Sequence, residues 1–200
     1  MFVKNLIILI ISYLLGSINT SIILSKIILN DDIRNHGSGN AGATNALRTM
    51  GKKGALLVVF GDILKTIIAI LLAKLILPHN PNAVYIAGLG AVLGHNFPVY
   101  FGFKGGKGVV ASTAAMLFAD PALGVIVVVI AISIMALSRY VSLGSIIGAV
   151  VFVVLSLIFK QGNFDFIVFA FILAILVIYM HKTNIKRLIS GTENKLSFKK

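Results

Sequence analysis

The stretch Gly105-Gly106-Lys107-Gly108 and the preceding Lys104 have the composition of an anion-binding loop. Glycine lets several backbone N–H groups turn toward one point, and lysine adds positive charge where they converge. The stretch lies among apolar runs of membrane length, where lysine is costly and marks function. It therefore predicts an oxyanion site. The alternative is a plain turn with two anchoring lysines, because short motifs also arise by chance.

The Walker-type phosphate loop of nucleotide hydrolases does not fit this stretch. That loop needs a glycine, four further residues and then Gly-Lys-Ser/Thr. Here Phe101 stands where the first glycine belongs, and Gly108 follows Lys107. ATP hydrolysis is therefore not supported by the sequence.

A second polar stretch offers hydrogen-bond donors of the kind that bind oxyanions. Residues 37–45, with the sequence Gly-Ser-Gly-Asn-Ala-Gly-Ala-Thr-Asn, precede Arg48, and residues 33–61 contain no carboxylate. Hydroxyls, carboxamides and a guanidinium can donate to an oxyanion without adding like charge. This composition favours binding over the alternative, which is a flexible exposed loop.

Two more stretches place basic and hydroxyl groups near helix ends. They are Ser138-Arg-Tyr-Val-Ser142 with Ser145, and His181-Lys-Thr-Asn184. If the last helix continues past residue 181, His181 and Asn184 are spaced i,i+3 and share a face. Arg139 has an alternative role, because it can anchor its helix among lipid headgroups. The lysines after residue 181 are interpreted as a basic helix tail at the membrane surface.

The charged groups of the four stretches suit two phosphate groups better than one. A phosphate monoester carries about −1.5 to −2 charges at neutral pH, and the relevant side chains are Arg48, Lys104, Lys107, Arg139 and His181. The sequence has no Cys, no zinc-type ligand spacing and no pair of carboxylates for a two-carboxylate mechanism. We therefore expect acyl or phosphoryl transfer by positioning and charge stabilisation, with no metal and no cofactor.

The composition is that of an integral membrane protein. Of the 200 residues, 58% are hydrophobic and 12% are charged, which is about half the charge of a soluble chain. The net charge of +12 is expected to reflect topology and contact with anionic lipid headgroups. Nucleic acid is not expected as a partner, because no soluble domain remains to bind it.

Seven apolar segments predict an all-α, polytopic membrane protein with one domain, 1–200. A spanning helix needs about 20 apolar residues, and the segments are 5–28, 54–77, 83–100, 109–119, 121–137, 143–160 and 164–181. The fourth segment is short, and a helix start at Pro121 separates it from the fifth. The alternative is a five-helix count, in which 83–108 and 109–137 are single passes. The first segment is too long for a signal-peptide core and is interpreted as a retained helix.

The distribution of Lys and Arg predicts that the N-terminus lies outside and the C-terminus in the cytoplasm. Lys and Arg are frequent in the expected inner loops, 29–53, 101–108, 138–142 and 182–200, and absent from the outer loops, 78–82, 119–121 and 161–163. Cytoplasmic loops of membrane proteins carry this excess. All four polar stretches then face the cytoplasm.

Some residues are expected to serve the fold. Asp62 and Lys65, one turn apart in the second segment, are expected to neutralise each other as a structural pair. Gly144 and Gly148 are spaced for close helix packing. His95, at the inner end of the third segment, is expected to be a structural hydrogen-bonding group rather than a catalyst.

The four polar stretches, in this order, resemble the motifs of the acyl-phosphate:glycerol-3-phosphate acyltransferases of bacterial membranes, the PlsY type. The resemblance covers essentially the whole chain. Its residues are Gly37-Ser-Gly-Asn-x-Gly-Ala-Thr-Asn45 with Arg48, Gly94-His-x-Phe-Pro98 with Phe103-Lys-Gly-Gly-Lys-Gly108, Ser138-Arg-Tyr-x-Ser142, and His181-x-x-Asn184-x-x-Arg187. The chain departs from the pattern at Asn19, where proline is expected.

The resemblance implies that a fatty acyl group passes from acyl phosphate to the 1-hydroxyl of glycerol 3-phosphate, giving lysophosphatidic acid and phosphate without acyl-CoA. It implies a multi-pass enzyme of the bacterial cytoplasmic (inner) membrane, with its active site facing the cytoplasm. The expected partners are acyl phosphate, glycerol 3-phosphate and membrane lipids, and we expect a monomer. Acyl phosphate is already activated, so the lack of a Cys or a His-x4-Asp pattern is consistent with this donor.

The site residues follow from the resemblance, position by position. Ser38, Lys107 and His181 are expected to be catalytic. The residues expected to bind substrate or phosphate are Arg48, Asn45, Lys104, Gly105, Gly106, Gly108, Arg139, Ser142, Ser145 and Asn184. The general base is either His181 or an oxygen of a substrate phosphate.

Two other classes of function fit the sequence less well. An anion or organophosphate transporter predicts charge near the bilayer midplane and repeat symmetry, but only Asp62 and Lys65 lie deep and no internal repeat is evident. A non-catalytic lipid-binding scaffold predicts scattered basic residues without glycine-rich loops. Neither explains four ordered motifs.

Overall fold

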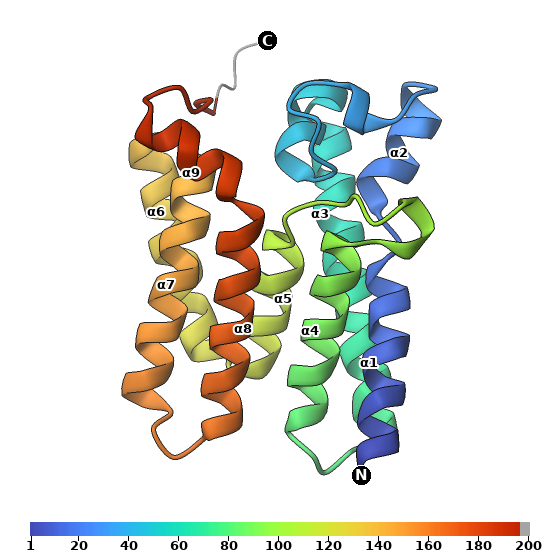
Figure 1. Ribbon diagram of the computed structural model, residues 1–200, viewed down its shortest axis with the longest axis vertical. Helices are drawn as coiled ribbons and strands as arrows, with labels where there is room; N and C mark the ends of the chain where they lie inside the picture. The colour runs from blue at the N-terminus through green and yellow to red at the C-terminus, as the bar shows by residue number, and fades with distance from the viewer. Residues whose placement is uncertain (197–200) are drawn as a thin grey trace. The chain divides into compact units, whose positions relative to one another are not determined.

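The computed structural model describes residues 1–196 and is all-helical over that range (Figure 1). The elements are α1 (Phe2–Gly16), α2 (Thr20–Ile28), η1 (Ile33–Asn35), α3 (Ala43–Ile76), α4 (Asn82–Asn96), η2 (Val99–Phe101), α5 (Val109–Ala119), α6 (Pro121–Ser138), α7 (Val141–Phe159), α8 (Phe164–Met180) and α9 (Lys182–Ile189). The expected all-α class is confirmed. Lys199 and Lys200, counted in the charge of the C-terminal tail, lie outside the described residues.

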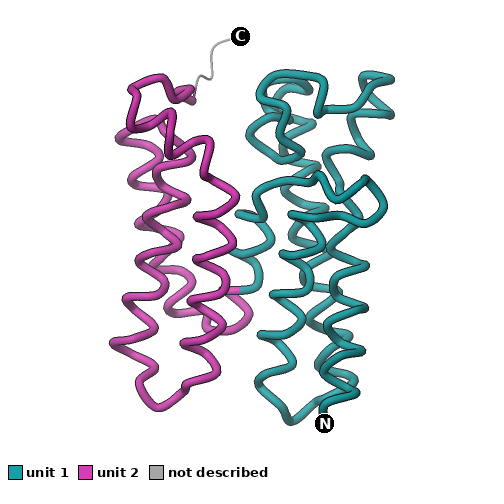
Figure 2. The backbone as a smooth tube through the Cα atoms, viewed as in Figure 1, with its two compact units in different colours: residues 1–115 teal, residues 116–200 magenta. Residues whose placement is uncertain are grey.

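The chain forms two compact units, Met1–Ala115 and Met116–Lys200, the second described as far as residue 196 (Figure 2). The first unit contains two of the four polar stretches, and the second contains the other two. The expectation of a single domain over 1–200 stays a prediction.

Five helical spans in the described residues are long and apolar enough to cross a membrane. They are Phe2–Ile28, Ala43–Ile76, Asn82–Phe101, Pro121–Ser138 and Val141–Phe159, and α8 with α9 makes a sixth if this bent pair is one span. α5, with 11 residues, is shorter. All seven apolar segments are therefore helical, while seven complete crossings and the expected orientation stay predictions.

The first segment is not one continuous helix, as the sequence analysis expected, but breaks between α1 and α2. Asn19 is fully buried at the break and caps α2, since its side chain accepts hydrogen bonds from Ile22 N at 3.1 Å and Ser21 Oγ at 2.8 Å. Asparagine is among the preferred N-cap residues because it satisfies an N–H group that has no partner in the helix. At the position where proline was expected, this chain therefore uses a side-chain cap.

α3 begins earlier than the predicted residue 54, and it contains one interruption. Gly51 has φ 72° and ψ −171°, which lie outside the helical region. This left-handed conformation favours glycine, because other residues would place Cβ against the backbone. Residues 43–50 therefore form a short helical segment before the long apolar part of α3.

Helices α1, α3 and α4 pack together in the first unit, with α2 against α3. A Cβ atom at Gly16 would overlap the backbone of Ala91, and one at Gly94 would overlap the carbonyl oxygen of Tyr13. Small residues of this kind let helix backbones meet closely in membranes. The contact fixes the C-terminal end of α4, which carries His95.

Helices α6, α7 and α8 form the core of the second unit. α6 starts at Pro121, as predicted, and Asp120 caps it by accepting a hydrogen bond from Leu123 N at 2.9 Å. A Cβ atom at Gly144 would lie 2.6 Å from the carbonyl oxygen of Ala131, and one at Gly148 would lie 3.1 Å from Ala131 Cβ. The predicted close packing at the two glycines is therefore confirmed.

Candidate functional site

The glycine loop, residues 102–108, leads from η2 to the N-terminus of α5. Gly105 N donates to Asn96 O and Gly106 N donates to His95 O, both at 3.1 Å. These two N–H groups hold the loop against the end of α4, so they are already used. The backbone donors that remain to be considered are those of Gly108 and the first turn of α5, because the first N–H groups of a helix have no intrahelical partner.

The glycines of the loop are required by close approach and by backbone conformation. A Cβ atom at Gly105 would overlap His95 O, and one at Gly106 would overlap His95 Nε2 and the carbonyl oxygen of Ala41. Gly108 has φ +72°, a conformation that favours glycine. The loop therefore packs directly on α4 and on the first polar loop. Lys104 is exposed and Lys107 is half-buried.

Arg34 joins the first polar loop to the glycine loop, a role that the sequence analysis missed. Its Nη1 donates to Phe101 O at 2.8 Å and to Lys104 O at 3.0 Å. Its Nε and Nη2 donate to the two carboxylate oxygens of Asp32 at 3.0 and 2.7 Å. The planar guanidinium can make all four bonds at once, which an ammonium cannot. In the sequence, Arg34 was interpreted only as one of the positive charges that predict the membrane orientation, although the nearby Asp32 indicated a possible ion pair.

The contacts of Arg34 also change the titration of the pair. The hydrogen bond from Arg34 holds the pKa of Asp32 below its ordinary value, against the opposing effect of burial. The same hydrogen bond raises the pKa of Arg34. Both groups therefore stay charged at neutral pH, and the bridge between the two loops is maintained.

Asn45, expected to bind substrate, is instead engaged within its own loop. Its Oδ1 accepts from Ser38 N at 2.9 Å, and its Nδ2 donates to Ile33 O at 3.2 Å and His36 O at 3.0 Å. Its side chain is buried. We therefore revise its role from binding to positioning, because it fixes the backbone of the exposed Ser38.

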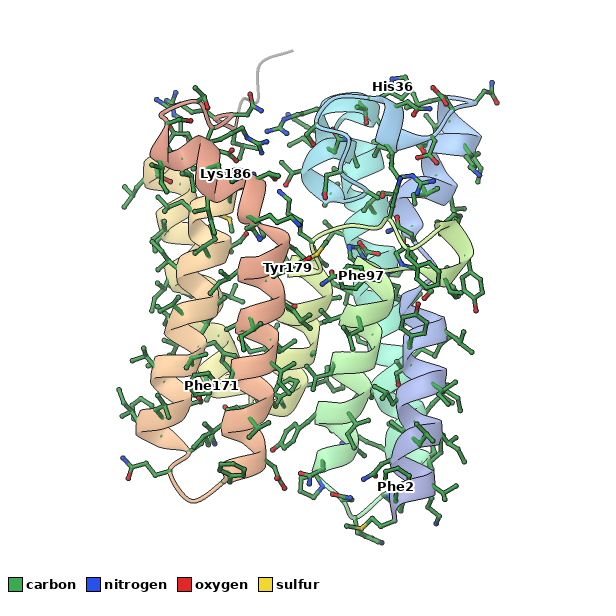
Figure 3. All side chains as sticks on the ribbon, in the orientation of Figure 1. Phe2, His36, Phe97, Phe171, Tyr179 and Lys186 are labelled. Atoms are coloured by element: carbon green, nitrogen blue, oxygen red, sulfur yellow. The ribbon has the colours of Figure 1, made fainter. Side chains whose placement is uncertain are left out.

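Arg48 lies on the short helical segment 43–50, in the same unit as the glycine loop, and is exposed. Figure 3 labels two landmarks of this unit, His36 on the first loop and Phe97 directly after α4. The first unit thus contains five of the residues assigned to the site in addition to the three loop glycines. They are Ser38, Asn45, Arg48, Lys104 and Lys107.

The buried pair in α3 is confirmed. Lys65 Nζ lies 2.8 Å from Asp62 Oδ1, and both side chains are almost completely buried. His95 Nδ1 lies 3.0 Å from Lys65 Nζ and 3.5 Å from Asp62 Oδ1. The expectation that His95 is a structural hydrogen-bonding group agrees with these contacts.

In the second unit, three donors converge on a carboxylate that the sequence analysis did not assign. Glu193 accepts hydrogen bonds from Ser142 Oγ at 2.8 Å, Asn184 Nδ2 at 2.6 Å and Arg187 Nε at 2.7 Å. Its side chain is 6% exposed. Two of the predicted phosphate binders, Ser142 and Asn184, therefore form an oxyanion-binding group together with Arg187. A carboxylate within the basic stretch 181–195 was the signal for this role.

The pKa of Glu193 shows which effect dominates at this group. Burial alone raises the pKa of a carboxyl group, because it disfavours the charged form. The hydrogen bonds from Asn184, Arg187 and Ser142 lower the pKa of Glu193 and outweigh that effect. The carboxylate is therefore ionised at neutral pH.

His181 lies at a bend, so helical structure continues past residue 181, as the sequence analysis considered, but in a new direction. It ends α8 and begins α9, and the angle between these two helices is 62°. Figure 3 labels Tyr179 before the bend and Lys186 after it. Its Nδ1 lies 2.7 Å from Val177 O. A carbonyl oxygen only accepts, so Nδ1 carries a hydrogen and donates it to Val177 O. His181 and Asn184 are both buried at this bend.

The remaining assigned residues of the second unit differ in exposure. Arg139 has φ 63° at the end of α6, its side chain is exposed and its carbonyl oxygen accepts from Leu196 N at 2.7 Å. Ser145 is buried, and its hydroxyl donates to Val141 O at 2.9 Å within α7. Residues 1–196 contain no cluster of three or more His, Cys, Asp or Glu that can hold a metal. That the four stretches form one site without a metal stays a prediction.

Comparison with known proteins identifies the family that the motifs resemble. A family model described as "Glycerol-3-phosphate acyltransferase" matches residues 6–191. The chain is 49% identical over 190 residues to a glycerol-3-phosphate acyltransferase of Thermoanaerobacter sp. (strain X514), covering 95% of this chain and 94% of that protein. It is 42% identical over 199 residues to that of Clostridioides difficile (strain 630), covering 98% and 97%.

Two crystal structures are also similar to the chain. PlsY (YgiH), an integral membrane glycerol 3-phosphate acyltransferase, in its glycerol 3-phosphate form matches with a TM-score of 0.89, 36% sequence identity and coverage of 96% of both chains. The lysophosphatidic acid form of PlsY matches with a TM-score of 0.84, 35% identity, and coverage of 97% of this chain and 96% of that chain. The likeness therefore extends over nearly the whole of each protein.

Proposed function

The chain belongs to the glycerol-3-phosphate acyltransferase family, and from this premise we propose that its acyl donor is acyl phosphate. The acyl group then passes to the 1-hydroxyl of glycerol 3-phosphate, and the products are lysophosphatidic acid and inorganic phosphate. The fold match to PlsY in its glycerol 3-phosphate form over 96% of both chains is the observation that carries the proposal. The chemistry of the residues supports it independently.

The donor chemistry fits a site without an enzyme nucleophile. Acyl phosphate already contains a good leaving group, and the chain has no Cys and no His followed five positions later by Asp. The C–O bond from the glycerol hydroxyl to the acyl carbon forms, and the bond from that carbon to the phosphate oxygen breaks. The hydroxyl proton passes to a base, and the electron pair of the broken bond leaves with phosphate. Positioning and charge stabilisation are the contributions required from the protein.

The residues of the first unit are assigned to phosphate binding and to activation of the leaving group. Lys107 and Lys104 supply charge, and Gly108 with the first turn of α5 supplies N–H groups. Gly105 and Gly106 hold this loop on α4 through their N–H groups. Ser38, placed by Asn45, and Arg48 are assigned to glycerol 3-phosphate.

The residues of the second unit are assigned to the acceptor substrate and to a phosphate. Asn184 and His181 are assigned to glycerol 3-phosphate and Arg139 to one of the phosphates. Ser142 and Ser145, whose hydroxyls donate to Glu193 and to Val141 O, are assigned to positioning around that phosphate. We assign His181 Nε2, the ring nitrogen other than the one bonded to Val177 O, as the acceptor of a hydrogen bond from the 1-hydroxyl. The proton acceptor is this nitrogen or a phosphate oxygen, and the pH profile of a His181→Gln variant separates the two. The proposed enzyme is a monomer of the bacterial cytoplasmic membrane, with its site facing the cytoplasm.

An assay of the purified protein tests the donor assignment. Acyl phosphate and labelled glycerol 3-phosphate should give labelled lysophosphatidic acid, whereas acyl-CoA should give almost none. Equal activity with the CoA donor would overturn the assignment. Excess chelator at matched ionic strength should leave turnover unchanged, and loss that is restored by one divalent ion would reveal a metal role.

A further inference from the structure

Three ionisable side chains are buried together beneath the glycine loop, and the proposed reaction does not use them. They are Asp62 and Lys65 of α3 and His95 of α4, with exposed fractions of 1%, 6% and 3%. Charged groups are buried at this depth only when they are paired and hydrogen-bonded. The contacts of Lys65 determine the chemical state of His95.

The ammonium group of Lys65 has three hydrogens and three acceptors. Its Nζ lies 2.8 Å from Asp62 Oδ1, 2.9 Å from the carbonyl oxygen of Ile18 and 3.0 Å from His95 Nδ1. An ammonium group donates and cannot accept. Since the other two partners are oxygens that only accept, the third hydrogen goes to His95, whose Nδ1 must then be unprotonated.

The charge balance of the cluster supports the same state. Asp62 and Lys65 neutralise each other, and Thr20 Oγ1 also donates to Asp62 Oδ1 at 3.2 Å. A protonated His95 would add a second buried positive charge beside Lys65, which desolvation and repulsion both oppose. With Nδ1 accepting from Lys65, the neutral His95 ring carries its hydrogen on Nε2.

The hydrogen on Nε2 is directed toward the glycine loop. A Cβ atom at Gly106 would overlap His95 Nε2, so the ring occupies the space that a side chain at that position would fill. Gly106 N donates to His95 O, which fixes this part of the loop on the same residue. Among residues 1–196, none accepts a hydrogen bond from Nε2.

We infer that His95 is a further anion-binding residue, which donates Nε2–H to an oxygen of a phosphate bound at the glycine loop. Asp62 and Lys65 are positioning residues that hold His95 in the donating tautomer. The identity of the anion as a substrate phosphate rests on the proposed function. The tautomer itself does not, because it follows from the contacts of Lys65.

Nitrogen-15 NMR of the protein labelled at histidine measures the tautomer directly. The chain has four His residues, and the spectrum of a His95→Gln variant identifies the signal of His95. We expect a neutral ring with a protonated Nε2 and an unprotonated Nδ1 at neutral pH. In Lys65→Met, which removes the donor to Nδ1, the ring should change to a mixture of tautomers. A ring in the wild-type protein that is protonated at Nδ1 would overturn the inference.

Titration with inorganic phosphate tests the binding role without any turnover. Phosphate should shift the Nε2 signal of His95, with little effect on His79, an exposed histidine of the same unit that serves as the control. A shift at the Gly106 amide with none at His95 Nε2 would mean that the ring only supports the fold.

Two substitutions of His95 distinguish its role as a donor through Nε2 from its role as the hydrogen-bond partner of Lys65 through Nδ1. In His95→Gln the amide nitrogen can reach the position of Nε2, whereas in His95→Asn the amide can replace only Nδ1. We expect His95→Gln to retain phosphate affinity within about threefold, and His95→Asn to weaken it about tenfold, which is about 1.4 kcal/mol. The reverse order, with Asn better than Gln, would overturn the inference. His79→Asn is the matched control and should have no effect.

The outcomes distinguish this inference from the proposed function. Phosphate binding at His95 Nε2 in a protein without acyltransferase activity would support the anion site and contradict the proposed reaction. Full activity with acyl phosphate and no response of His95 to phosphate would support the reaction and show that His95 does not bind the phosphate. The two conclusions can therefore fail separately.

Discussion

Lys107 is separated from the first residue of α5, Val109, by Gly108 alone, so its charge adds to that of the helix N-terminus. If it stabilises phosphate as charge moves from the acyl donor, Lys107→Ala should lower turnover about 10²-fold or more, the effect of removing one preorganised electrostatic group. Lys107→Arg should restore little, because a planar guanidinium does not replace a point charge in a tight loop. Steady-state kinetics of the folded variants measures both.

The control for this prediction is Lys199→Ala, in the basic tail beyond the described residues, which should be nearly silent. Near-normal turnover of a well-folded Lys107→Ala protein would reduce the glycine loop to a structural turn. Both variants lose one ammonium group, so a difference in turnover between them reflects the position of the lysine and not the change in net charge.

Glu193 makes the second unit sensitive to acid. Its pKa in the folded protein is lowered by Asn184, Arg187 and Ser142 relative to the ordinary value of 4.5. The ionised Glu193 therefore stabilises the folded state fully above the unfolded-state pKa. This stabilisation is lost as the pH falls through the lower pKa of the folded state. Thermal unfolding between about pH 3 and 6 should show this loss in the wild-type protein and a much weaker pH dependence in Glu193→Gln. Equal pH dependence in the two proteins would contradict the role of the carboxylate.

At the scale of elements, Arg34 determines how the first polar loop meets the glycine loop. Arg34→Lys keeps the charge but loses the four-bond geometry to Asp32, Phe101 and Lys104. We expect kcat/KM to fall about tenfold, which is about 1.4 kcal/mol of transition-state stabilisation. Melting temperature and kinetics, measured together, separate this loss from unfolding.

Lys53→Ala is the control for this experiment, because Lys53 is exposed on α3 and makes no bridge between loops. If Arg34→Lys and Lys53→Ala both retained full activity, the bridge would have no part in shaping the site. A drop only in Arg34→Lys would assign the effect to the loop geometry rather than to net charge.

The apolar segments predicted the helices well because membrane helices need long apolar runs, but they did not predict the breaks. The break before α2 depends on a cap at Asn19, and the bend at His181 falls between two helical segments that contain no proline. Hydropathy does not register either feature.

The motifs assigned residues to the candidate site, but they did not predict the contacts that these residues make. Motif order assigned Ser38, Asn45 and Ser142 to the site. In the structure, however, the side-chain amide of Asn45 is hydrogen-bonded within its own loop, and Ser142 donates to Glu193. Such partners lie far apart in the sequence, since Ser142 and Glu193 are 51 positions apart. Spacing within one motif therefore carries no information about them.

At the scale of the whole molecule, the predicted topology can be tested with single cysteines, because the chain has none. Cysteines at Ser38, Lys104 and Thr183, all exposed, should resist an impermeant thiol reagent outside intact cells and react after permeabilisation. Gly106 is unsuitable for this experiment, because a Cβ atom there would overlap His95 and Ala41. Efficient labelling of any of the three from outside would exclude a single cytoplasmic face for the four stretches.

The interruption at Gly51 has a stereochemical consequence. Apart from the adjoining backbone, no atom lies within 4 Å of the place where a Cβ atom would stand, so the restriction at this position comes from the local backbone conformation and not from packing against other parts of the protein. The values φ 72° and ψ −171° are the mirror image of a relaxed extended conformation. L-alanine at position 51 should therefore strain the backbone between the two helical parts of α3 despite the open space. D-alanine, introduced by chemical ligation, should fit it without strain and make the joint stiffer than glycine does.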